Sequence, residues 1–330
     1  MAHCTNDRHQ HPQQGSHRHP HHRAVSRGPV VVLAGGTGGA KLARGLLDHV
    51  GEDLVVIANT ADDIEIYGVP VSPDPDLISF TLADLIDDRG WGIDGDSFKA
   101  MDALRRHGSS VWFNLGDRDI AWCAERRRLL ERGSTPTRAM ALLTNAIGVE
   151  ARVLPMSNQQ VQTQVYARGS WHGLQQFLIS EQGAGPVDGV RLIGIDEARP
   201  TAEVMEAIAN ARTIIIGPSN PVISIGPILE LSGLYDALLD SPAPLLAVSP
   251  IVGGSVLKGP TAEFMKHAGL SVDAAGIAAA YEGLIDGLIT DEPVAIEGLK
   301  VTVASTLMDS PQSRRIVARN ALAAADALSL

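Results

Sequence analysis

The sequence predicts an α/β fold, Rossmann-like, with a mostly parallel sheet, helices on both faces and a smaller α+β insertion. Short apolar runs of strand length, such as 30–33 and 213–216, alternate with segments of helical periodicity. The first run leads directly into a glycine-rich turn and a helix start. Small residues, glycine and proline also follow later strands, at 217–221 and 249–254. Together these features are typical of a sheet whose strand ends meet a ligand.

The elements are expected in the following order. Strands are expected at 30–33, 54–58, 111–115, 153–156, 161–167, 190–195, 213–216, 245–248, 284–289 and 299–304. Helices are expected from about residue 40, at 77–87, 97–107, after residue 119, and at 136–147, 171–180, 201–210 and 311–328.

Two local patterns refine this order. The prolines within 70–75 predict a stiff loop rather than a helix, with Asp76 as the cap of the helix that follows. The segments 153–156 and 161–167 alternate apolar and polar residues, as half-buried antiparallel strands do. They predict the α+β insertion, at about 136–190. The arginines of 126–132 are expected to form a solvated helix face.

Composition limits the class of protein. The formal charge of −11 argues against a nucleic-acid or anionic membrane surface. Cys4 and Cys123 give neither a disulfide framework nor a zinc spacing, and no apolar run reaches spanning length, so we expect a cytoplasmic protein. Residues 1–27 hold seven of the eleven histidines and are expected to be a disordered tail, which leaves 28–330 as the folded domain.

The turn after the first strand is a candidate nucleotide-phosphate site, because glycines let the amides of a helix start approach an anion closely. The candidates are Gly35, Gly36, Thr37, Gly38 and Lys41, joined by Ser219 and Asn220 at the exit of the 213–216 strand. A tight structural turn is the alternative. The P-loop pattern is absent, and no acid ends the second strand, which argues against a nicotinamide oxidoreductase.

Four aspartates lie just past the second expected strand: Asp62, Asp63, Asp74 and Asp76. Carboxylates on stiff loops suit Mg²⁺, which takes few protein oxygens and shares the rest with phosphate and water. An acidic protein that handles phosphates needs such a cation, or local amides and basic side chains. The alternative is that each aspartate caps a helix or turn.

Together the motifs resemble the 2-phospho-L-lactate transferase family of coenzyme F-420 biosynthesis, which includes phosphoenolpyruvate transferases, over about residues 29–310. The matching segments are Gly35-Gly36-Thr37-Gly38 with Lys41, Asn59-Thr60-Ala61-Asp62-Asp63, Ser72-Pro73-Asp74-Pro75-Asp76, Gly90-Trp91-Gly92-Ile93, Leu115-Gly116-Asp117-Arg118-Asp119, Leu154-Pro155-Met156-Ser157, Gly217-Pro218-Ser219-Asn220-Pro221 and Ser249-Pro250-Ile251-Val252-Gly253-Gly254. A sister family of nucleotide-sugar-binding regulatory proteins shares the glycine loop and provides the alternative function. It has a glycine- and serine-rich segment where this chain has 64–68.

The resemblance implies an Mg²⁺-dependent enzyme, often a homodimer. It would move a 2-phospholactyl, phosphoenolpyruvyl or 3-phosphoglyceryl group from its guanosine diphospho-activated form to the ribityl hydroxyl of the deazaflavin Fo. GMP would be released. The residues alone do not decide among the three acids.

The resemblance also implies residue roles. Asp63 and Asp76 would hold Mg²⁺ with Asp62 and Asp74 in support, and Asp62, Asp63 and Asp76 would be the catalytic group. Asp76 and Asn114 would line the deazaflavin site, with Trp91 as a ring neighbour. The family often has Lys where this chain has Asn114, so the contact there loses a charge. It usually has Leu where this chain has Pro75, which is a second departure. No general base stands out, although Asp62 or a metal-activated hydroxyl would serve.

Overall fold

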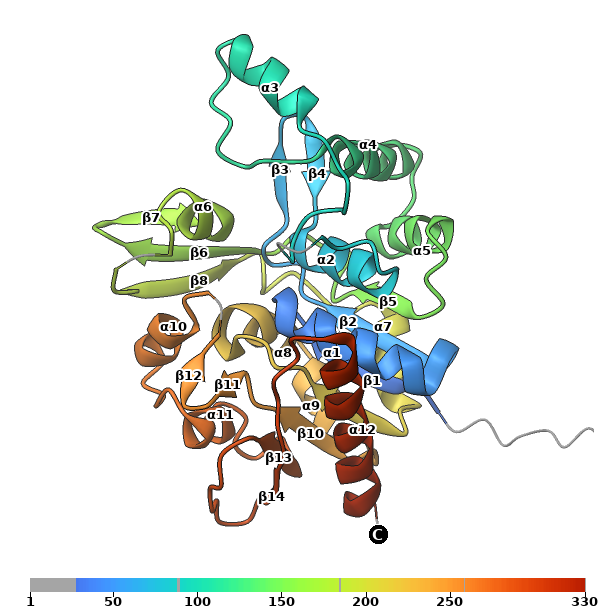
Figure 1. Cartoon of the computed structure of the whole chain (residues 1–330), viewed down its shortest axis with the longest axis vertical. Helices are drawn as coiled ribbons and strands as arrows, with labels where there is room; N and C mark the ends of the chain where they lie inside the picture. The colour runs from blue at the N-terminus through green and yellow to red at the C-terminus, as the bar shows by residue number, and fades with distance from the viewer. Residues whose placement is uncertain (1–27, 88–89, 184, 258, 330) are drawn as a thin grey trace, which may run out of the picture.

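A seven-stranded parallel sheet forms the middle of the computed structural model, which describes residues 28–87, 90–183, 185–257 and 259–329 (Figure 1). Its order is β14-β13-β10-β9-β1-β2-β5. The strands are β1 (Val30–Ala34), β2 (Leu54–Ala58), β5 (Arg152–Pro155), β9 (Thr213–Ile216), β10 (Leu245–Val248), β13 (Gly287–Thr290) and β14 (Lys300–Val303). The α/β prediction is confirmed. The expected tail, 1–27, lies outside the described residues.

The strand order reverses beside β1. The chain first adds β2 and β5 on one side of β1, and later returns to lay β9 along the other side. Loops leaving two strands on opposite sides of such a reversal diverge, and the crevice between them is where open parallel sheets bind ligands. The topology therefore places the loops after β1 and β9 at the expected ligand edge.

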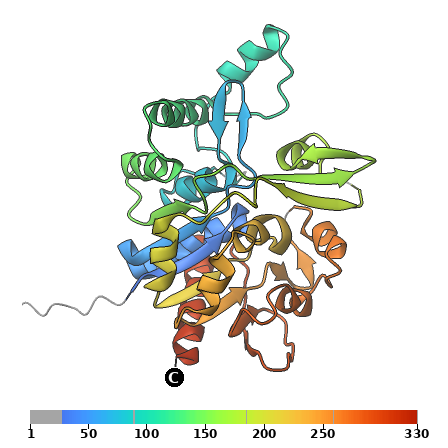
Figure 2. The ribbon, with the colours of Figure 1, turned by 180° about the vertical axis from the view of Figure 1, so that it is seen from behind.

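Helices cover both faces of the sheet, because the strands are apolar on both sides. Val30, Val32 and Ala34 pack in one cluster with α1 (Gly36–Val50) and α12 (Pro311–Leu328). Val31 and Leu33 belong to a second cluster. That cluster also takes in α7 (Ala202–Ala209), α8 (Gly226–Leu229), α9 (Leu234–Leu239) and α11 (Ala274–Ala280). Figure 2 shows the yellow α7 in front of the sheet when the molecule is seen from behind.

A lobe stands beyond the β5 side of the sheet (Figure 1). It contains the hairpin β3 (Ile64–Ile66) and β4 (Val69–Val71) with α2 (Pro73–Leu82), α3 (Lys99–Arg106), α4 (Asp117–Glu131) and α5 (Pro136–Ala146). Phe80, Met101 and Trp122 belong to its own apolar cluster. The lobe is thus tied together by side chains rather than by the main sheet.

A three-stranded antiparallel sheet takes residues 162–193. It consists of β6 (Gln162–Ala167), β7 (Ser170–Gly173) and β8 (Gly189–Ile193), with α6 (Leu174–Ile179). The remaining elements are η1 (Gly51–Asp53), the π-helical turn η2 (Pro221–Ile225), β11 (Ile251–Val252), β12 (Ser255–Val256) and α10 (Thr261–His267). Among the described residues, no helix has both the length and the apolar character needed to cross a bilayer.

Three predicted strands are wrong in kind or place. Residues 111–115 form no strand, because their apolar side chains pack into the lobe cluster and they pair with no strand among the described residues. Residues 153–156 are not part of the antiparallel insertion, since β5 pairs parallel with β2. Residues 190–195 do not resume the parallel sheet, since β8 pairs antiparallel with β6. Alternation alone does not tell which sheet a strand joins.

Some helix predictions also need correction. Helix α2 begins at Pro73 rather than at residue 77, because proline fits the first turn of a helix, where its missing N–H is not needed. Its N-cap is therefore Ser72, and Asp76 lies inside the first turn. The segment expected as a helix over 171–180 begins as strand β7 and becomes helical at Leu174. The strand expected from 284 begins at Gly287.

Candidate active site

A cavity of about 1270 Å³ opens where the loops after β1, β2, β9 and β10 meet the lobe, α6 and α10. It brings together Gly35, Gly36, Thr37, Gly38, Lys41, Asp62, Asp74, Asp76, Trp91, Asn114, Ser219 and Asn220. Of the predicted site residues, Asp63 is not part of its wall. Segments more than 180 residues apart thus share one cavity, as Gly35 and Ser219 do. We call the part at β1 and β9 the glycine end, and the part at α2 and α4 the aromatic end.

The glycine end is held by backbone and short side chains. Ser219 Oγ donates to Gly35 O at 2.6 Å and accepts from Gly35 N at 3.3 Å. Asn220 caps η2 by accepting from the amides of Val222 and Ile223. Ser219 and Asn220 therefore stabilise the loops that shape this end, and their hydrogen-bonding groups are largely engaged within the protein.

Two glycines are required here for different reasons. Gly36 has φ of +62°, a conformation that side-chain-bearing residues rarely adopt. A Cβ on Gly38 would lie 2.0 Å from the carbonyl oxygen of Pro218. The first turn of α1 consequently lies directly against the loop after β9, and its residues Gly36, Thr37 and Gly38 line the cavity, where a helix start favours an anion.

Asp74 connects the glycine loop to α2. Its Oδ1 accepts from Gly36 N at 2.5 Å, and its Oδ2 accepts from Asn59 Nδ2 at 3.0 Å. Burial raises the pKa of this carboxyl to about 6, although both hydrogen bonds favour the charged form. A carboxylate at the start of α1 occupies one of the amides expected to bind phosphate.

Asp62 lies on the cavity wall and is held from the antiparallel insertion. Gln175 of α6 donates from Nε2 to Asp62 Oδ2 at 2.9 Å. The buried Oδ1 has no hydrogen-bond partner among the described residues. Burial, with Asp74 and Asp63 nearby, raises the pKa of Asp62 well above its usual range. Sequence reasoning missed Gln175, because nothing local marks a glutamine that lies 113 residues from its partner.

Asp63 sits behind the wall rather than in it. Its Oδ1 accepts from Ser72 Oγ at 2.6 Å. Burial raises the pKa of this carboxyl to about 8, and the guanidinium of Arg126 and the Ser72 hydroxyl lower it only in part. In this arrangement Asp63 supports the aspartate helix α2 through its N-cap residue, Ser72.

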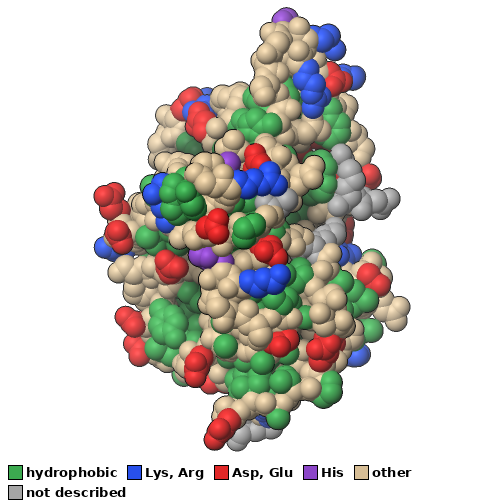
Figure 3. Space-filling model, turned by 90° about the vertical axis from the view of Figure 1, so that its left-hand side faces the viewer, with side chains coloured by type: hydrophobic (Ala, Val, Ile, Leu, Met, Phe, Trp, Pro, Cys, Tyr) green, Lys and Arg blue, Asp and Glu red, His purple; other side chains and the backbone are tan. Residues whose placement is uncertain are grey.

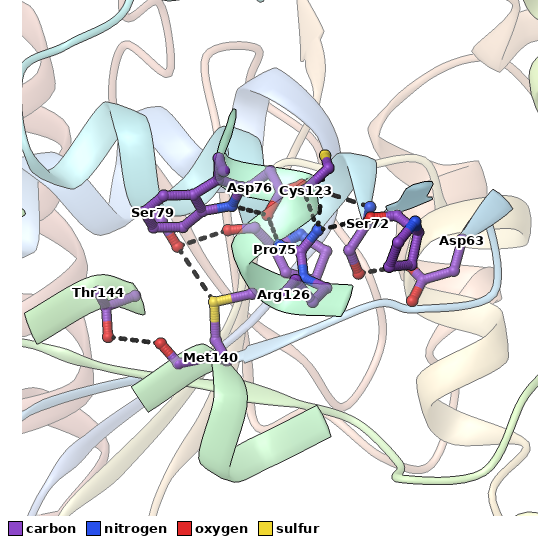
Figure 4. Close-up of polar contacts among 11 residues, drawn as sticks. Asp63, Ser72, Pro75, Asp76, Ser79, Cys123, Arg126, Met140 and Thr144 are labelled. Carbon is purple, nitrogen blue, oxygen red and sulfur yellow. Dashed lines mark hydrogen bonds and ion pairs between the residues drawn. The ribbon is translucent and has the colours of Figure 1, made fainter. Parts of the chain in front are cut away.

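Asp76 forms a buried ion pair with Arg126 of α4 (Figure 4). Arg126 Nη1 donates to Asp76 Oδ2 at 3.0 Å and Nη2 donates to Oδ1. Trp122 Nε1 donates to Oδ1 at 2.8 Å. Arg126 is 6% exposed, so the predicted solvated arginine face is wrong for this residue. Removing one partner of such a buried pair typically destabilises a protein by about 3–5 kcal/mol.

Helical spacing could have identified Arg126. The buried residues of α4 are Trp122, Cys123, Arg126 and Leu129, which recur every three to four positions along one face. Arg127 and Arg128 fall off that face and pair with Glu65 and Glu125 at the surface. An arginine in the apolar stripe of a helix is therefore the signal that the run of arginines concealed.

The aromatic end is built by the lobe. Phe80 of α2 and Trp122 of α4 pack edge to face with ring centroids 4.9 Å apart. Trp112 and Phe113, from the segment wrongly expected as a strand, also line the cavity. Trp91 lies at the rim of the cavity and is 50% exposed. Asn114 lines the cavity too, and its side-chain oxygen accepts from Arg105 Nη2 at 2.8 Å, which leaves its amide N–H groups as donors.

The acids fit a hard divalent cation. No group of three or more His, Cys, Asp or Glu in the described parts of the chain could hold a metal ion alone. Mg²⁺ commonly takes only one or two carboxylates and completes its shell with phosphate and water. Asp62 has a buried carboxylate oxygen without a partner, whereas both oxygens of Asp76 are already engaged by Arg126 and Trp122. Both oxygens of Asp74 also accept hydrogen bonds, from Gly36 N and Asn59 Nδ2, so among the described wall carboxylates Asp62 is best placed to hold a cation, with Asp74 beside it.

The face that carries the antiparallel insertion and α10 has no broad basic patch among its described residues. Figure 3 shows that basic and acidic side chains are mixed on it. Within the described cavity wall, Lys41 is the one lysine or arginine, beside several carboxylates. A polyphosphate chain of nucleic acid requires a broad basic surface, and this cavity suits a single small anion instead.

Comparison with known proteins gives a consistent set of relatives. The sequence model of the family described as 2-phospho-L-lactate transferase CofD matches residues 30–313. A 2-phospho-L-lactate transferase of Methanosarcina acetivorans is 35% identical over 298 residues, 88% of this chain and 96% of the relative. A phosphoenolpyruvate transferase of Kitasatospora aureofaciens is 35% identical over 314 residues, 90% and 98% of the two chains. A crystal structure of a UPF0052 family protein from Bacillus halodurans has a TM-score of 0.53 at 21% identity and covers 82% of each chain, which supports the fold alone.

Proposed function

The chain belongs to the 2-phospho-L-lactate transferase family, and from this premise we propose that it transfers a phospho-acid from a guanosine diphospho-activated donor to the deazaflavin Fo. It is a transferase, and the phospho-group transfer of this family serves coenzyme F-420 biosynthesis. The observation that carries the finer proposal is the continuity of the cavity. One wall is a glycine loop, the other is aromatic, and carboxylates lie with them in the same cavity.

The proposed donor lies along the glycine end. Its diphosphate would face the amides of Thr37 and Gly38 and the ammonium of Lys41. The carboxylates of Asp62 and Asp74 would repel a diphosphate bound in the same cavity unless a cation lay between the diphosphate and the carboxylates. Mg²⁺, held by these two groups, would supply that charge and stabilise the oxygens of the transition state. Asp63 and Asp76 remain the ligands implied by family resemblance, and Asp76 would first have to release a donor.

The proposed acceptor lies at the aromatic end. The deazaflavin ring would pack against the aromatic wall, and Asn114 would donate from its amide to a ring oxygen or nitrogen. The oxygen of the ribityl hydroxyl then attacks the phosphorus that carries the acid. The bond from this phosphorus to the GMP oxygen breaks and its electron pair stays with GMP, while the Asp62 carboxylate oxygen that does not hold the cation would take the hydroxyl proton.

The test is an Fo-dependent GMP-release assay with purified protein and Mg²⁺. Lactyl, enolpyruvyl and glyceryl donors are run in parallel, because a 2-phospho-L-lactate transferase and a phosphoenolpyruvate transferase are equally similar to this chain, at 35% identity. We expect GMP and a phosphodiester product with at least one donor. If no donor yields GMP while a nucleotide sugar binds without metal, the protein is a regulator like those of the sister family.

The expected homodimer and cytoplasmic location remain predictions. Sedimentation velocity of the purified chain tests the first, with a species of twice the 34.9 kDa chain mass as the expected result.

A further inference from the structure

The Arg126 guanidinium lies under the aromatic end and links its own helix α4 to two other elements. It pairs with both carboxylate oxygens of Asp76 on α2, and its Nη1 donates to Pro70 O of strand β4 at 3.1 Å. Asp76 is 7% exposed and lines the cavity. A planar guanidinium that binds a carboxylate through two nitrogens fixes orientation as well as distance, which a lysine ammonium does not.

The carboxylate of Asp76 is saturated by the protein. Besides the two Arg126 nitrogens it accepts from Trp122 Nε1 at 2.8 Å and from Ser72 N at 3.3 Å. A carboxylate has about four acceptor positions. Asp76 therefore holds the indole of Trp122 at one oxygen while Arg126 holds both oxygens.

The indole of Trp122 connects the Arg126–Asp76 pair to the cavity wall. The Trp122 ring lines the cavity and packs edge to face on Phe80. Within the part of the chain that the structure describes, no hydrogen bond of Arg126 reaches the glycine end, where the partners are Gly35, Ser219 and Asp74. A defect at Arg126 should accordingly disturb one end of the cavity and spare the other.

We propose that Arg126 is a positioning residue for the acceptor substrate, acting through Asp76 on the orientation of Trp122. The proposal rests on the proposed function for the identity of the acceptor. It assigns a role to a residue that lies behind the wall, and it explains why an arginine occupies the apolar stripe of α4.

The first test needs no substrate. The indole N–H resonance of Trp122, identified by its loss in Trp122→Phe, is followed by proton–nitrogen NMR in Arg126→Lys and in the matched control Arg128→Lys. Arg128 lies two residues along the same helix and pairs with Glu125 at the surface. We expect the resonance to move in Arg126→Lys and to stay in Arg128→Lys. An unmoved resonance in a folded Arg126→Lys protein overturns the proposal.

The second test separates positioning from folding. In Arg126→Lys we expect the KM for Fo to rise by about tenfold, while the KM for the guanosine donor and the Kd for GDP stay within about twofold. Trp122→Phe keeps an aromatic ring, although a smaller one, and loses the N–H donor, so it should show a smaller change in the same direction. Equal losses at both ends, in step with a lowered Tm, would assign Arg126 a purely structural role. Absence of turnover in the wild type would refute the proposed function alone, because the NMR test stands without it.

Discussion

The two ends of the cavity are built in different ways. At the glycine end, β1 and β9 lie side by side in the sheet and deliver Gly35 and Ser219 to each other although they are 184 residues apart. At the aromatic end, Asp76 of α2 meets Arg126 and Trp122 through side chains that reach it from α4, which itself packs on strand β4 and helix α5. The first end depends on backbone geometry, and the second depends on side-chain packing. Substitutions should therefore have sharper effects at the first end and more selective effects at the second.

The largest expected effect is at Gly38. In Gly38→Ala the new Cβ meets the Pro218 carbonyl at 2.0 Å, so the α1 start and the loop after β9 must separate. We expect nucleotide affinity to fall by about 100-fold, measured by calorimetric titration with GDP and Mg²⁺.

Gly36→Ala is the matched control for this variant. Its Cβ meets nothing within 4 Å, so that variant carries only the strain of its positive φ. Equal losses in the two variants would mean that backbone strain, rather than contact between the two loops, explains the result.

The next effect concerns the link between Asp62 and the insertion. Gln175→Ala removes the donor to Asp62 Oδ2 and should lower kcat by about tenfold, because a carboxylate without its orienting partner samples more positions. Gln176→Ala, one residue along α6 and exposed, is the control and should leave kcat unchanged. A normal kcat in Gln175→Ala would show that Asp62 needs no support from α6.

Much of the glycine end was predictable from the sequence, because a parallel sheet brings strand exits together whatever their separation along the chain. The residues Gly35 to Gly38, Lys41, Ser219 and Asn220 all line one cavity, and their binding of a nucleotide stays a prediction. The aromatic end was predictable only in part. Asp76, Trp91 and Asn114 line it, but Trp112 and Phe113 lie in a segment that resembles a strand.

Arg126 and Gln175 escaped prediction for a physical reason. The apolar stripe of α4 marks Arg126 as buried, but no local pattern specifies that its partner is Asp76, 50 residues away, or that the partner of Gln175 is Asp62, 113 residues away. The prolines of α2 led to a wrong prediction of a loop. Pro73 instead begins the helix that carries Asp74 and Asp76.

A modest effect is expected at the rim of the aromatic end. Trp91 lines the cavity but is 50% exposed, so it contributes contact area without fixing a wall. Trp91→Ala should raise the KM for Fo by about threefold and leave the KM of the guanosine donor unchanged. Steady-state kinetics with each substrate varied in turn measures both. A change in the donor KM instead would place Trp91 beside the nucleotide.

The last effect concerns stability in the absence of ligands. The folded-state pKa of Asp74 is about 6, above the unfolded value of 3.8, so the folded protein binds more protons than the unfolded chain between these values. Its contribution to the free energy of unfolding should fall as pH rises from about 4 to 6 and level off above. Asp74→Asn should lose this part of the pH dependence in denaturant titrations. An identical pH profile in the variant would contradict the raised pKa.

The central claim is that one cavity holds both substrates at once, the nucleotide at its glycine end and the deazaflavin at its aromatic end. Calorimetric titration of Fo into protein already saturated with GDP and Mg²⁺ tests this claim most directly. Simultaneous occupancy predicts that Fo binds with one-to-one stoichiometry and an affinity no weaker than in the absence of GDP. If GDP abolishes or competitively weakens Fo binding, the two ends are not separate sites and the claim is wrong.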